Sequence, residues 1–152
     1  MKKYFLSAVL TLGLFLLTFS CSSDKVMTDN SAEIKQISDM AKSGTWRITN
    51  YNDSGQDETS DYTGYSFTFN ENGTLIATNG TNTYSGTWSV SDDSSSDDNP
   101  DDIDFNIFFA SPPNFEELSD DWDISSSSSV KIELIDVSGG NGGTDLLTFE
   151  KN

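Results

Sequence analysis

Hydrophobic and polar residues alternate one by one over most of the chain after Gly44. Trp46 and Ile48 flank one polar residue, and Phe67 and Phe69 flank another. A period of two places large side chains on one face of a β-strand. The pattern therefore predicts strands that each bury one face.

Residues 65–90 contain three such strands separated by turn sequences. Asn-Glu-Asn-Gly at 70–73 leads into a strand at 74–78, and Asn79-Gly80 follows at once. Asn-Gly is typical of the two-residue type I′ hairpin turn, in which both central residues have positive φ. The next strand runs over 84–90, so we expect a three-stranded antiparallel meander.

Further strands are predicted at residues 103–107, 122–124, 130–137 and 146–150. Pro112-Pro113 interrupts the pattern because proline cannot donate to a strand ladder. About eight short strands with little helix predict an all-β antiparallel barrel or sandwich. Barrel closure removes exposed edges, which a protein with many short strands needs.

A short helix is predicted before the strands. Asn30 or Ser31 is positioned to cap it, Glu33 favours its first turn, and Gly44 ends it. Its apolar face comprises Ile34, Ile37, Met40 and Ala41. A helix this short is marginal alone, so we expect this face to cover one end of the sheet structure.

The first twenty residues have the order of an export signal. Lys2 and Lys3 precede an apolar stretch over 4–19, which ends at Ser20-Cys21. A membrane-spanning helix needs about 20 apolar residues, and this stretch is shorter and contains polar positions. We expect residues 1–20 to be a signal peptide and residues 21–30 a flexible tether to a domain at 31–152.

Cys21 is the only cysteine of the chain, so an internal disulfide is excluded. The segment 16–21 resembles the lipobox of bacterial lipoproteins, although Thr18 and Phe19 stand where that family usually has leucine and a small residue. The resemblance implies lipidation of Cys21 and attachment to the outer membrane, on its periplasmic or its surface face. The alternative is a plain secretory signal before an incidental cysteine.

Charge and composition exclude nucleic-acid binding and several kinds of catalysis. Without Lys2 and Lys3 the chain has six basic and 25 acidic residues, a net charge of −19. Such a body repels nucleic acid. The absence of histidine and of a second cysteine removes Ser-His-Asp, Cys-His and His-ligated zinc chemistry. We therefore expect a monomer that is not an enzyme and has no cofactor.

Several short motifs resemble the lipocalin-like domains carried by many Gram-negative lipoproteins. They are Gly44-Thr45-Trp46, its repeat Gly86-Thr87-Trp88, the run from Phe67 to Leu75, and Leu147 to Lys151. The resemblance covers about residues 44–152. It implies an eight-stranded up-and-down barrel whose mouth or interior accommodates a small apolar ligand, without supplying a ligand.

Candidate ligand-binding residues are the large aromatics Trp46, Phe67, Phe69, Trp88, Phe105 and Trp122. The first five are expected inside the barrel, where they either line a cavity or form the packed core. Trp122 stands between two aspartates and is expected to be more exposed. A further reading is a glycan-binding surface of exposed Tyr51, Tyr62 and Trp122.

The acidic stretch 92–102 suggests a calcium-binding site. Asp97, Asn99 and Asp101 fit the first, third and fifth places of an EF-hand loop, but Asp102 and Phe108 replace the required glycine and glutamate. We therefore favour a solvated loop.

The leading function is a lipid-anchored binding module for a small apolar ligand. The alternative is a structural or interaction lipoprotein with a filled barrel, whose acidic loops bind calcium or a cationic partner.

Overall fold

The computed structural model describes residues 30–92, 103–137 and 142–152. Its elements are, in chain order, helix α1 (Ser31–Ala41), β1 (Trp46–Asp53), β2 (Gln56–Asp57), the 3₁₀ helix η1 (Thr59–Tyr62), β3 (Ser66–Phe69), β4 (Thr74–Thr78), β5 (Thr83–Asp92), β6 (Ile103–Phe108), α2 (Pro113–Glu116), β7 (Asp120–Ser127), β8 (Lys131–Val137) and β9 (Thr144–Lys151).

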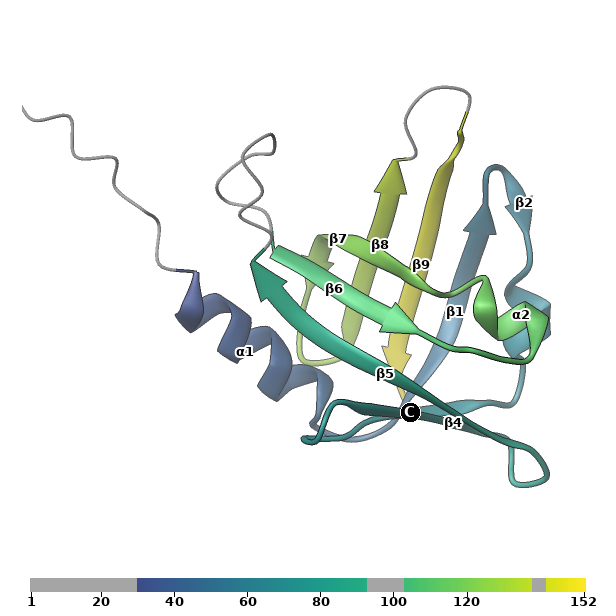
Figure 1. Cartoon of the computed structure of the whole chain (residues 1–152), viewed down its shortest axis with the longest axis horizontal. Helices are drawn as coiled ribbons and strands as arrows, with labels where there is room; N and C mark the ends of the chain where they lie inside the picture. The colour runs from purple at the N-terminus through teal and green to yellow at the C-terminus, as the bar shows by residue number, and fades with distance from the viewer. Residues whose placement is uncertain (1–29, 93–102, 138–141) are drawn as a thin grey trace, which may run out of the picture.

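The strands form a closed antiparallel barrel (Figure 1). From β3 to β9 each strand pairs with the next, and β1 pairs with both β3 and β9. Strand β2 adds a short ninth strand beside the end of β1. The prediction of an all-β, up-and-down antiparallel barrel of about eight strands with one short N-terminal helix is confirmed, whereas β2, η1 and α2 were not predicted.

A bulge in β1 decides which residues of that strand face inward. Ile48 pairs with Phe149, but Asn50 pairs with Thr148, so β1 has one extra residue at this point. Strict alternation would place Asn50 inside. The extra residue instead turns Tyr51 into the core, where it is 2% exposed.

The predicted meander is present as β3, β4 and β5, but the predicted turn type is wrong. The β4–β5 connection has four residues, 79–82, and of its members only Gly80 has positive φ, at 84°. The Asn79 carboxamide oxygen accepts the backbone N–H groups of Thr81 and Asn82, at 3.0 and 2.8 Å. This side-chain acceptor stabilises the longer turn.

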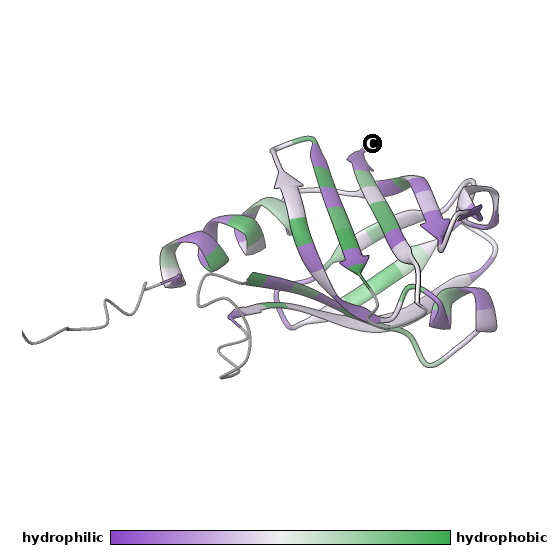
Figure 2. Ribbon diagram, turned by 90° about the horizontal axis from the view of Figure 1, so that it is seen from above, coloured by the Kyte–Doolittle hydropathy of each residue, from purple (hydrophilic) through white to green (hydrophobic). Residues whose placement is uncertain are grey.

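Helix α1 docks as expected on one end of the barrel. Ile37 and Ala41 are 3% and 0% exposed and belong to the core, and Met40 is partly buried against it. Hydrophobic and hydrophilic residues alternate along the strands (Figure 2). Their inward side chains and the buried face of α1 therefore form one continuous core.

Candidate functional site

The six aromatic residues proposed as ligand contacts are all buried. Their exposed fractions are 0% for Trp46, Phe67 and Phe105, 1% for Phe69 and Trp122, and 8% for Trp88. The interior position of the first five is confirmed. The expected exposure of Trp122 is wrong, because Trp122 pairs across the sheet with inward-facing Phe105 and its flanking aspartates take the other face.

These rings contact one another within the barrel. The Phe69 ring centroid lies 5.2 Å from that of Trp88, 5.4 Å from that of Phe105 and 5.5 Å from that of Phe149. Such edge-to-face contacts are typical of a packed aromatic core. The middle of the barrel is thus occupied by side chains of the protein itself.

Phe115 of α2 fills the end of the barrel opposite α1, which we call the mouth. It is fully buried, and its ring centroid lies 4.7 Å from that of Tyr84, 5.1 Å from that of Tyr65 and 5.4 Å from that of Tyr62. The ring of Phe109 is 5.2 Å away. Helix α2 therefore closes the mouth with a single aromatic side chain.

Tyr51 and Tyr62 attach α2 to the rest of the mouth. The Tyr51 hydroxyl donates to the carbonyl of Glu117 at 2.7 Å, and the Tyr62 hydroxyl donates to the carbonyl of Asn114. Burial and nearby carboxylates raise the pKa of both phenols, which keeps them protonated as donors. The expectation of an exposed glycan-binding surface of Tyr51, Tyr62 and Trp122 is therefore wrong.

Two hydroxyl groups at the mouth act as strand partners. Thr59 Oγ1 accepts the N–H of Tyr51 at 2.8 Å and donates to its carbonyl at 3.3 Å. Ser119 Oγ makes the same pair of bonds with Phe109, at 2.9 and 3.2 Å. Buried backbone groups need such partners, and these two complete the ladder where β-pairing stops.

The α1 end is closed by Trp46. Its indole N–H donates to the carbonyl of Ala41 at 2.8 Å, and Lys151 Nζ lies 5.5 Å from the ring centroid. Arg47 donates to the carbonyl of Lys151 at 2.9 Å and pairs with Glu150 at 3.1 Å. These contacts join the start of β1 to the end of β9.

An open depression lies outside the barrel across β5, β6 and β7, and we call it the outer hollow. Its volume is about 510 Å³, and its lining comprises Thr87, Trp88, Ser89, Asn106, Ile107, Phe108, Ser119, Asp120 and Asp121. Phe108 is 57% exposed. A neighbouring depression of about 350 Å³ shares Phe108 and Ser119 and adds Phe109, Ala110 and Glu116.

Asp120 has an unusual environment in the outer hollow. Partial burial, and secondarily the neighbouring Asp121 carboxyl and Asp136, raise its pKa to about 6. Neither Asp120 nor Phe108 was predicted from the sequence to contact a ligand. Three consecutive large apolar residues at 107–109 were the available signal, since in a half-buried strand one of them must face outward.

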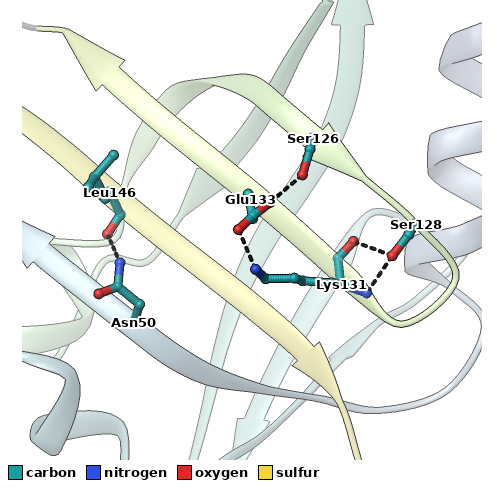
Figure 3. Close-up of polar contacts among 6 residues, drawn as sticks. All are labelled: Asn50, Ser126, Ser128, Lys131, Glu133 and Leu146. Atoms are coloured by element: carbon teal, nitrogen blue, oxygen red, sulfur yellow. Dashed lines mark hydrogen bonds and ion pairs between the residues drawn. The ribbon is translucent and has the colours of Figure 1, made fainter.

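A second depression, of about 400 Å³, lies on the outer face of β1, β9 and β8. Figure 3 shows that its polar groups contact one another: Lys131 pairs with Glu133, which accepts a hydrogen bond from Ser126, and Asn50 donates to the carbonyl of Leu146. Because its charged groups are already paired, this face is the weaker candidate.

The other sequence-predicted sites fall beyond the described residues. Cys21 and the calcium candidates Asp97, Asn99 and Asp101 are outside the ranges that the structure describes. Within those ranges, no group of three or more Asp, Glu, His or Cys residues is arranged to hold a metal ion. No helix among the same residues is long and apolar enough to cross a membrane.

The match to one family model agrees with the barrel. The family model described as a lipocalin-like domain matches residues 43–116. A solved structure of a DUF4847 family protein from Bacteroides vulgatus is similar, with 18% sequence identity and a TM-score of 0.49, over 76% of this chain and 97% of that one. No curated protein matches the sequence. The chain is thus similar to lipocalin-like domains from the residues before β1 to the end of α2.

Proposed function

We propose that this protein is a lipid-anchored binding module of the cell envelope, and that its small ligand binds in the outer hollow. The proposal rests on the contrast between the interior of the barrel and its outer surface. Packed aromatic rings occupy the barrel centre, whereas Phe108 presents more than half of its surface beside a depression of about 510 Å³. Concave sites with a few polar groups among apolar ones are the usual places for small ligands.

Native mass spectrometry of the full chain after incubation with envelope extracts tests the site without guessing a ligand. We expect an added small-molecule mass that is lost in Phe108→Ser. Val130→Ser is the matched control, because Val130 is 60% exposed and lies outside the hollow. An added mass that persists in Phe108→Ser would place the ligand elsewhere.

The lipid anchor rests on Cys21 and the preceding signal-like residues. Two or more acyl chains hold a protein stably at a membrane. We expect Cys21→Ala to be unlipidated and released from the membrane fraction, as followed by fractionation and intact mass. A Cys21→Ala chain that still partitions with membranes would contradict the anchor while leaving the hollow unaffected.

The packed interior also favours a second candidate, an interaction lipoprotein whose acidic loops bind calcium or a cationic partner. The acidic segment 92–102 contains the calcium candidates Asp97, Asn99 and Asp101, although its sequence favours a solvated loop. Calorimetry with calcium is the direct measurement. Neither heat nor a thermal shift at millimolar calcium would remove the calcium form of this candidate.

A further inference from the structure

The outer hollow combines two kinds of lining. Phe108, which is 57% exposed, supplies apolar surface, and the carboxylates of Asp120 and Asp121 line the same depression. Register places Asp121 opposite Asn106, on the face of β6 that also carries Phe108, and Asp120 opposite Ile107 at the start of β7. The exposed ring of Phe108 and the Asp121 carboxylate therefore share the outer face of two paired strands, and Asp120 lines the same depression where β7 begins.

The described cations lie at the other end of the barrel. Lys35, Lys42, Arg47, Lys131 and Lys151 belong to α1 and the residue after it, the start of β1, the start of β8 and the end of β9. Four of them are ion-paired, and Lys151 donates to Ser43 and lies over the ring of Trp46. No lysine or arginine is among the residues lining the hollow.

The mouth end is acidic. The carboxylates on its elements and connections are Asp53, Asp57, Glu58, Asp61, Glu116, Glu117, Asp120, Asp121, Asp136 and Asp145. Carboxylates of one sign around a depression attract a cation over a distance of about a Debye length. A cationic ligand that enters the hollow is thus attracted by the surrounding surface as well as by its lining.

We propose that the outer hollow binds an organic cation that carries an apolar or aromatic group, with the ammonium against Asp120 and Asp121 and the apolar group against Phe108. This proposal rests on the proposed function and names the chemical class of its ligand. Aromatic faces attract quaternary ammonium groups, and a partly desolvated carboxylate gains more from a cation than a fully solvated one does. A neutral apolar molecule contacts Phe108 but leaves the two carboxylates without a cation, and the carboxylates repel an anion.

Titration of the full chain with benzyltrimethylammonium, benzyl alcohol and phenylacetate tests the charge requirement at a common ring size. NMR signals of the Phe108 ring report on the site. We expect the ammonium to bind roughly tenfold more tightly than the alcohol, with no shift from the carboxylate. Binding of the ammonium should strengthen between about pH 5 and pH 8, as Asp120 ionises beside Asp121 on β7 and Asp136 on β8.

The double variant Asp120→Asn/Asp121→Asn should lose most of the preference for the ammonium and keep the binding of benzyl alcohol. Asp53→Asn/Asp61→Asn removes two charges from the same end without touching the lining, and should change affinity by less than about twofold. Equal binding of ammonium and alcohol would overturn the cation class while leaving the hollow as a ligand site. If both double variants lose the same affinity for the ammonium, the preference comes from the overall negative charge of this end and not from Asp120 and Asp121, and the proposed site is wrong.

If none of the three compounds shifts the Phe108 signals, the cation proposal is wrong, and the extract experiment with Phe108→Ser then decides the proposed function on its own.

Discussion

The two ends of the barrel are closed in different ways. At the α1 end, Trp46 is held by one indole hydrogen bond to Ala41, with Lys151 above its ring. At the mouth, Phe115 is surrounded by five other aromatic rings, and tyrosine hydroxyls attach its helix. The α1 end carries the described cations, and the mouth carries carboxylates.

This difference shows where each end gets its stability. The α1 end is joined by residues near one another in sequence and by the pairing of β1 with β9. The mouth is assembled from η1, α2 and strand ends that lie more than 50 residues apart, such as Tyr62 and Asn114. We expect the mouth to depend more on packing, and the α1 end more on a few polar contacts.

The largest effect is expected from Phe115→Ala, which removes the side chain that fills the mouth. Loss of a fully buried phenylalanine costs about 3–5 kcal/mol of unfolding free energy. Urea denaturation followed by tryptophan fluorescence measures this cost. Phe108→Ala is the control, because the 57% exposed Phe108 should cost less than about 1 kcal/mol. Similar costs for the two variants would show that Phe115 does not close the mouth.

Trp46→Phe tests the α1 end. The ring is mostly retained, but the hydrogen bond to the Ala41 carbonyl is lost, and the unfolding free energy should fall by about 1–3 kcal/mol. Hydrogen exchange should accelerate in α1 and remain unchanged in α2. Equal acceleration at both ends would mean that the two closures are a single cooperative unit.

Ser119→Ala tests the hydroxyl that replaces a strand partner at the mouth. The N–H and carbonyl of Phe109 each lose a partner, which costs about 1–2 kcal/mol. Ser85→Ala, at an exposed position of β5, should be nearly neutral. The thermal unfolding temperatures of both variants give the comparison. If the unfolding temperature of Ser119→Ala equals that of the wild type, water replaces the lost partner of Phe109.

Asp120→Asn should have the smallest effect and the opposite sign. Because the folded pKa is raised to about 6, the folded chain holds this proton more tightly than the unfolded chain, and its stability falls as pH rises from about 4 through 6. Removing the charge should stabilise the protein at neutral pH by less than about 1 kcal/mol, since the group is partly solvated.

Denaturation of wild type and Asp120→Asn at both ends of this pH range measures the difference, with Asp61→Asn as the matched variant. A gain for Asp120→Asn that is independent of pH would contradict the raised pKa.

Much of the fold could be predicted because alternation is a local property. The positions of β3 to β6 and the inward direction of Phe67, Phe69 and Phe105 follow from a period of two. Two errors occurred where a nonlocal contact overrode the pattern. The bulge opposite β9 turned Tyr51 inward, and pairing with Phe105 buried Trp122. The third error was local: hydrogen bonds to the Asn79 side chain stabilise a four-residue turn in place of the predicted two-residue one.

The sequence by itself determined an acidic, histidine-free all-β domain with one short helix before its strands, since side-chain period, turn residues and composition need no knowledge of distant partners. Only the tertiary structure decided how the barrel is filled and where a ligand has room. Whether aromatic rings pack against one another depends on barrel closure, which brings Phe115 to Tyr62 and Phe69 to Phe149. Strand register, and not composition, sets which side chains share a face, and it places Asp121 on the outer face of the sheet with Phe108, because Asp121 pairs with Asn106, two residues before Phe108 on β6.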